Sequence, residues 1–239
     1  MRAVRTWGLA LLGIVAAVLL RRLEGGAPLE LIAGSPYGQF GRMALLANAR
    51  WLLLEGSAFA LAFQTAHRPP PAMEIVRRRS VADWFLHRLL ALGRDWLLFC
   101  AVIFAACLPD ALEQMDRFLV YALHAGCVFA GCLALCTEME NRSAVWLVFW
   151  AEVLLAMILG WIWEGSLPAQ VLSFGMLARC QSLARCQSLA RCQRLARCQS
   201  LAQSDGYAPA LALAVQALWM AALLTLAGVH ARKALERRE

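Results

Sequence analysis

Six long apolar stretches, separated by short loops whose charge alternates in sign, constrain the fold of this chain more than any other feature. The hydrocarbon core of a bilayer is about 30 Å thick, and an α-helix needs roughly 20 apolar residues to cross it. The stretches cover residues 4–20, 43–63, 95–108, 118–136, 144–163 and 209–229. They predict an all-α, polytopic membrane protein with six transmembrane helices, of which the first and third are short.

The composition agrees with a membrane environment. Hydrophobic residues make up 61% of the 239 residues and charged residues 16%, whereas a soluble domain carries roughly 25% charged residues. The mean hydropathy is +0.59. We therefore expect one transmembrane domain over residues 1–239. The first stretch is interpreted as a retained helix and not a signal peptide, because Arg21 and Arg22 follow it directly.

The loop between the second and third stretches is strongly basic. Its basic and histidine side chains are His67, Arg68, Arg77, Arg78, Arg79, His87, Arg88 and Arg94. The positive-inside rule places such a loop, together with the basic N- and C-termini, in the cytoplasm. Arg21, Arg22 and the five arginines before the sixth stretch are exceptions to this orientation. The net charge of +7 then reflects membrane topology, and we expect lipid as a partner and no nucleic acid.

A hexapeptide repeat, Leu-Ala-Arg-Cys-Gln-Ser, fills residues 177–202 of the predicted outer loop. A period of six spreads successive leucines over three faces of a helix, so the repeat builds no apolar stripe. Recent tandem duplication explains the near-identical copies. The alternative is a metal site made of the four repeat cysteines, but their uniform spacing fits no common zinc motif. We expect no metal and no cofactor.

The segment 73–94 precedes the third stretch and has the pattern of an amphipathic helix. Val81, Phe85 and Leu89 share one helical face, whereas Asp83 and His87 lie opposite. Arg88 is an exception, because it falls on the apolar side. Three interpretations stay open: an anchor for anionic lipid headgroups, a leading turn of the third span, or a surface that receives a cytoplasmic partner.

Polar residues interrupt three of the apolar stretches. They are Arg50 and Glu55 in the second, His124 in the fourth and Glu152 in the fifth. A charge at the centre of a membrane helix costs roughly 2.5–3.5 kcal/mol on insertion scales, so such side chains should face the bundle interior. Arg50 and Glu55 point about 140° apart on a helix and do not pair with each other. They line a substrate pathway or proton relay, or they form interhelical hydrogen bonds.

Motifs for catalysis are missing from the sequence. A phosphate-binding loop needs a lysine, and the only lysine, Lys233, lies in the C-terminal tail without a glycine-rich approach. There is no H-E-x-x-H, no G-x-S-x-G and no C-x-x-C pair. We therefore expect no enzyme activity in this chain. An integral membrane enzyme would have to use Glu152 with His124, which is the only candidate pair.

The lead-in Ile75, Arg77, Ser80 and Trp84 before the third stretch resembles a pattern in the permease subunits of type-2 ABC exporters, of the small bacterial six-helix kind. The tail from Gly228 onward is also similar to the ending of that family. The resemblance implies that the segment 73–94 is a coupling helix that docks on a separate ATPase, and that two permeases pair. The repeat and the charged second stretch depart from the family pattern.

The expected function follows from this resemblance. The chain would be a multi-pass permease of the cell (plasma) membrane, paired as a homodimer or with a sister permease, that exports a hydrophobic peptide or drug when a partner hydrolyses ATP. The coupling residues would be Arg77, Arg78, Arg79, Ser80, Asp83, Trp84, His87 and Arg88. The alternative is a non-transport assembly factor or sensor that binds a cytoplasmic partner through the same helix.

Overall fold

The computed structural model describes residues 2–24, 31–32, 42–67, 81–108, 110–139, 141–162 and 209–236 of the chain. Within these residues every regular element is a helix, so the all-helical fold predicted from the sequence is confirmed. The helices are α1 (Arg2–Glu24), α2 (Arg42–Ala66), α4 (Val81–Ala106), α5 (Asp110–Glu113), α6 (Met115–Glu138), α7 (Arg142–Ile162) and α12 (Pro209–Glu236).

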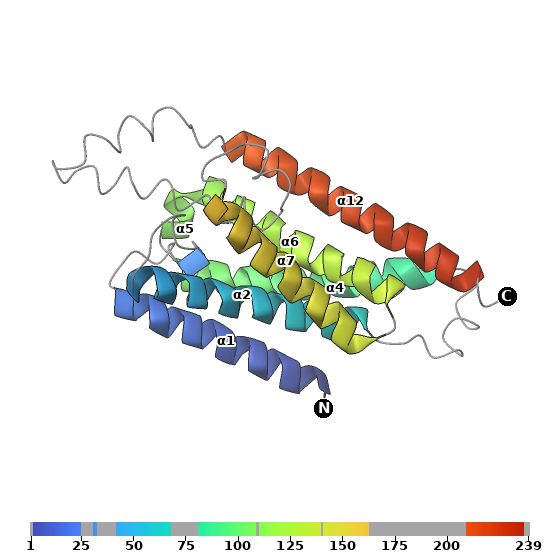
Figure 1. The fold of residues 1–239 in the computed structure, drawn as a ribbon, viewed down its shortest axis with the longest axis horizontal. Coiled ribbons are helices and arrows are strands. Elements are labelled where there is room, and N and C mark those ends of the chain that lie inside the picture. Colours follow the sequence, from blue (N-terminus) through green and yellow to red (C-terminus); the bar gives the residue numbers. More distant parts are fainter. Residues whose placement is uncertain are drawn as a thin grey trace.

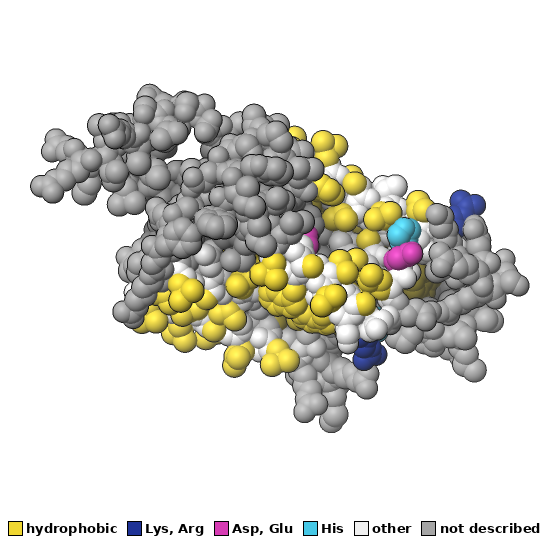
Figure 2. Space-filling view, in the orientation of Figure 1, with side chains coloured by type: hydrophobic (Ala, Val, Ile, Leu, Met, Phe, Trp, Pro, Cys, Tyr) yellow, Lys and Arg dark blue, Asp and Glu magenta, His cyan; other side chains and the backbone are white. Residues whose placement is uncertain are grey.

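The long helices lie side by side in a bundle, with α6 at its centre (Figure 1). Helix α6 packs against α2, α4, α7 and α12, and α1 packs on the opposite side of α2. The buried share of each helix agrees with this arrangement. In the central helix α6, 78% of the apolar window is buried, against 22% in α1 and 11% in α12. The outer helices therefore present apolar side chains outward, as Figure 2 shows for one face, and lipid is the solvent that suits such a surface.

Four helices among the described residues are long and apolar enough to cross a membrane, namely α1, α4, α6 and α12. The membrane character predicted from the sequence is supported by these four. The predicted span 43–63 lies within α2, and the predicted span 144–163 lies within α7 as far as Ile162, the last described residue there. Arg50 and Glu55 lower the hydropathy of α2, and the side chains of α7 after Leu154 lie outside the described residues. The count of six spans and the cytoplasmic termini stay predictions.

The third apolar stretch differs most from the helix that contains it. We predicted a span at 95–108 after a separate amphipathic segment, but α4 runs unbroken from Val81 to Ala106. Its membrane-length part begins at Asp83. Residues 81–94 are thus the first turns of the same helix, which agrees with the leading-turn interpretation. The predicted span began too late in the sequence, at Asp95, because Arg88, Arg94 and Asp95 lower the hydropathy of residues 81–95, although Arg88 and Asp95 are buried within the bundle.

Small residues and aromatic rings bring the helices together. Gly13 of α1 lies against Ser57 and the Leu53 carbonyl of α2, in a space that leaves no room for a Cβ atom. On the other side of α2, the ring of Phe59 stacks on Phe149 of α7 with centroids 3.9 Å apart. These contacts hold α2 between α1 and α7, so that its remaining face meets α4 and α6.

Several predicted features lie outside the described residues. The repeat 177–202 with its four cysteines is one of them, and so is the segment 68–80, which contains Arg77, Arg78, Arg79 and Ser80. The structure therefore does not test the metal-site alternative for the repeat. It also does not test half of the predicted coupling residues.

Candidate functional site

A polar link joins the last turn of α2 to α4. Thr65 donates its hydroxyl to Asp95 Oδ2 at 2.7 Å, and Arg88 Nη1 donates to the Thr65 carbonyl oxygen at 2.6 Å. All three residues are buried. We call this arrangement the α2–α4 link. It places a guanidinium and a carboxylate of α4 in contact with the same residue, Thr65, at the end of α2.

The sequence explains why the Thr65 carbonyl needs Arg88. The last four carbonyls of a helix have no intrahelical partner, and the residue four positions after Thr65 is Pro69, which has no N–H group to donate. A cation at a helix C-terminus is also favoured by the helix dipole. Arg88 is only 7% exposed and its guanidinium lies 5.4 Å from the ring centre of Trp84. Its position on the apolar face, which the periodicity left unexplained, is therefore a capping position.

The predicted coupling residues divide into two groups in the structure. Asp83 and His87 are exposed at the start of α4. Trp84 is half-buried, and Arg88 is turned into the bundle by the α2–α4 link. Arg94, which pairs with Asp95 at 2.9 Å, is 71% exposed. The accessible part of the predicted surface is thus the first two turns of α4, with Arg88 tying those turns to α2.

A second polar contact lies midway along the two central helices. Glu55 of α2 and His124 of α6 meet with Oε1 and Nε2 2.8 Å apart, and their side chains are 3% and 1% exposed. Trp51, one turn before Glu55, stacks on the imidazole with ring centres 6.2 Å apart. The ring centre of Tyr121 lies 6.4 Å from the imidazole centre. We call Glu55 and His124 the buried pair.

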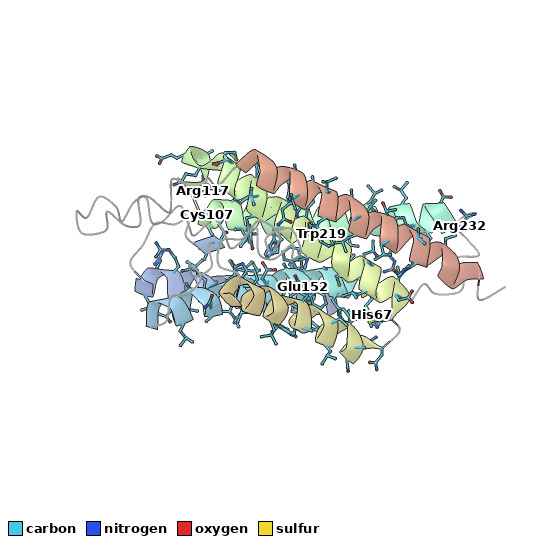
Figure 3. The ribbon with its side chains drawn as sticks, turned by 45° about the horizontal axis from the view of Figure 1, so that its top comes forward. His67, Cys107, Arg117, Glu152, Trp219 and Arg232 are labelled. Atoms are coloured by element: carbon cyan, nitrogen blue, oxygen red, sulfur yellow. The ribbon has the colours of Figure 1, made fainter. Side chains whose placement is uncertain are left out.

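The four polar residues predicted inside the membrane are only partly brought together. Glu55 and His124 join across two helices, which the sequence did not predict as a pair. Arg50 is completely buried five residues earlier on α2. Glu152 is half-buried on α7, where Figure 3 labels it. The interhelical hydrogen bond is therefore observed for Glu55 and His124, whereas a pathway or relay through all four stays a prediction.

Sequence reasoning missed several buried polar residues, among them Thr65, Asp95 and Gln216. Thr65 and Asp95 belong to the α2–α4 link, and Gln216 of α12 is fully buried beside Cys127 of α6, whose Sγ lies 3.2 Å from Gln216 Oε1. A single uncharged amide in an apolar stretch was the signal for Gln216, since an amide in lipid needs a partner. For Asp95 the signal was its position at the edge of an apolar run, where we took it as a boundary.

Two further contacts hold the end of the bundle where α4 begins. Arg142 Nε of α7 donates to His67 Nε2 at 2.7 Å, and His230 Nδ1 of α12 lies 3.0 Å from Glu138 Oε2 of α6. Figure 3 shows His67 toward one end of the bundle and Cys107 toward the other. Burial, and then the Arg142 charge, lower the pKa of His67 below its ordinary value of 6.5. A neutral imidazole is also what a bond accepted from Arg142 requires.

Metal ligands are not gathered in this part of the chain: within the described residues, no three His, Cys, Asp or Glu side chains form a set that could hold an ion. Comparison with known proteins gives no family either, since no family model, no curated protein and no solved structure matches this chain.

Proposed function

We propose that this chain is a membrane permease subunit that a separate cytoplasmic ATPase moves through the start of α4. The observation that carries the proposal is the α2–α4 link. Asp83 and His87 are accessible within the first two turns of α4, and Arg88 in the next position is bonded to the end of α2. A partner that displaces the exposed turns therefore moves two helices together.

The link gives a displacement a route into the bundle. Thr65 is ten residues after Glu55 on α2, which is about 15 Å along the helix axis. A helix of this length transmits an axial or tilting movement as a rigid body. Movement of α4 would thus reach Glu55 and change its contact with His124 on α6. Paired with a second copy or a sister permease, such a bundle would open a path for a hydrophobic peptide or drug across the plasma membrane.

The test reverses charge on the exposed turns and leaves the link intact. We expect the double variant Asp83→Lys, His87→Glu to insert normally in its host membrane but to lose an ATPase that co-purifies with the wild-type chain in mild detergent. The readout is the ATPase activity of the purified complex and the identification of its subunits by mass spectrometry. Glu113→Lys is the matched control, because Glu113 is also exposed but belongs to α5, beyond the opposite end of α4.

The outcomes separate the two functions considered. Loss of ATPase from the double variant, with retention in the Glu113→Lys control, supports the permease. Retention of the ATPase in both variants contradicts coupling through α4. Co-purification of a defined partner that has no nucleotide-binding domain, and that depends on Asp83 and His87, would favour the alternative of an assembly factor or sensor.

A further inference from the structure

The buried pair lies deep inside the described bundle. Glu55 is near the middle of α2 and His124 near the middle of α6, so each is several turns from either end of its helix. Both side chains are almost completely inaccessible, and their polar atoms are 2.8 Å apart. An ionised carboxylate in such surroundings is costly unless a cation or a donor faces it.

Histidine is the partner whose charge changes most easily near neutral pH. With a proton on both ring nitrogens, His124 is a cation that cancels the charge of Glu55. When one proton leaves for solvent, a neutral imidazole remains, and the contact keeps at most a hydrogen bond without the attraction between charges. Because the two groups are 2.8 Å apart, a proton held between them belongs to the pair and not to one residue.

Other charged or titratable groups lie on the helices that pack near the pair. Besides Arg50 on α2 and Tyr121 on α6, they are Cys127 of α6, which interacts electrostatically with Glu55 and Glu152, Cys100 and Cys107 of α4, which do so with Tyr121, Glu152 of α7, and the buried Arg21 of α1. Gln216 of α12 is uncharged. Arg50 is the cation nearest to Glu55 along α2, about 8 Å away along the axis.

We infer that Glu55 and His124 form a proton-binding site that controls the packing of α2 on α6. One exchangeable proton is held on His124 facing Glu55 Oε1, where it completes an ion pair between the two helices. Its release to solvent removes the positive charge and weakens the contact. The inference does not rest on the proposed function, because it concerns the ligand of the pair and not the force applied to α4.

The test follows the four histidines of the full chain by NMR in detergent micelles, with ¹⁵N in the imidazole rings. The chain has only His67, His87, His124 and His230, so each signal is assigned by its loss in one His→Gln variant. We expect a distinct protonation step for His124. In Glu55→Gln, which keeps the shape of the side chain but removes its charge, His124 should bind its proton at least about tenfold more weakly. Glu152→Gln is the control, since it removes a carboxylate outside the pair.

Each outcome decides the inference. A titrating His124 whose proton affinity falls in Glu55→Gln and changes less in Glu152→Gln supports the site. A His124 signal that does not titrate, or that responds equally to both variants, overturns it. If Glu55→Gln does not fold, the variants of His67, His87 and His230 locate the His124 step with Glu55 in place. The absence of that fourth step then overturns the inference.

Discussion

At the scale of single residues, the structure shows why charged side chains are tolerated in an apolar bundle. Arg88 satisfies a carbonyl that Pro69 leaves without a donor, and Glu55 meets His124. Helical periodicity identified Arg88, Glu55 and His124 as unusual but did not identify their partners. The partners lie on other helices, 23 and 69 residues away in the sequence. A pattern within one helix contains no information about partners that are so far apart along the chain.

Replacing Arg88 should destabilise the bundle. In Arg88→Ala the Thr65 carbonyl loses its charged donor, and a lost buried hydrogen bond to a charged group costs about 1.5–3 kcal/mol. Arg94→Ala is the matched control, because the Arg94 side chain is 71% exposed and an exposed ion pair is worth about 0–1 kcal/mol. Chemical unfolding in detergent measures both. An equal loss of unfolding free energy in the two variants would show that the buried α2–α4 link stabilises the bundle no more than an exposed ion pair does.

His67 should make the packing of α2 on α7 sensitive to acid. Its pKa in the folded chain is below the ordinary value of 6.5, first because of burial and second because of Arg142. The unfolded chain therefore binds more protons here, and stability falls as the pH drops below about 6.5. We expect NMR of the His67 imidazole to show a lowered pKa that rises in Arg142→Gln. An unchanged pKa in that variant would contradict the contact.

At the scale of elements, the apolar stretches located the six long helices among the described residues, but not all of their ends. The stretch at 118–136 lies within α6 with only a few residues added at each end. The stretch at 95–108, in contrast, missed the first half of α4. Hydropathy counts Arg88 and Asp95 as polar residues, whereas both are buried, and Asp95 accepts the Thr65 hydroxyl. The ends of a membrane helix depend on such partners, which hydropathy cannot detect.

The contact between α1 and α2 should depend on Gly13. A methyl group there would collide with Ser57 Oγ, so Gly13→Ala should destabilise the chain by about 1–3 kcal/mol, as overpacking does. Ser57→Ala removes the colliding atom and should restore most of the loss in the double variant. Gly8→Ala is the control, since nothing lies within 4 Å of its added Cβ. A double variant no more stable than Gly13→Ala would contradict this packing.

At the scale of the whole molecule, one end of the bundle contains several polar contacts between helices. The ends of α2 and α6, the starts of α4 and α7, and the end of α12 carry the α2–α4 link, the His67–Arg142 bond and the Glu138–His230 pair. Composition and hydropathy predicted a helical membrane protein, which is the part that short-range patterns determine. The order of packing around α6 could not be predicted, because it depends on close contacts such as Gly126 against Met220.

Topology is the most direct test of this account, because a cytoplasmic ATPase needs the start of α4 inside the cell. In a chain freed of its nine cysteines, single His87→Cys and Glu113→Cys variants are labelled with a membrane-impermeant maleimide in intact cells and in inverted vesicles. We predict that His87→Cys reacts only in inverted vesicles and Glu113→Cys only in intact cells. Labelling of His87→Cys from outside the cell would contradict the account.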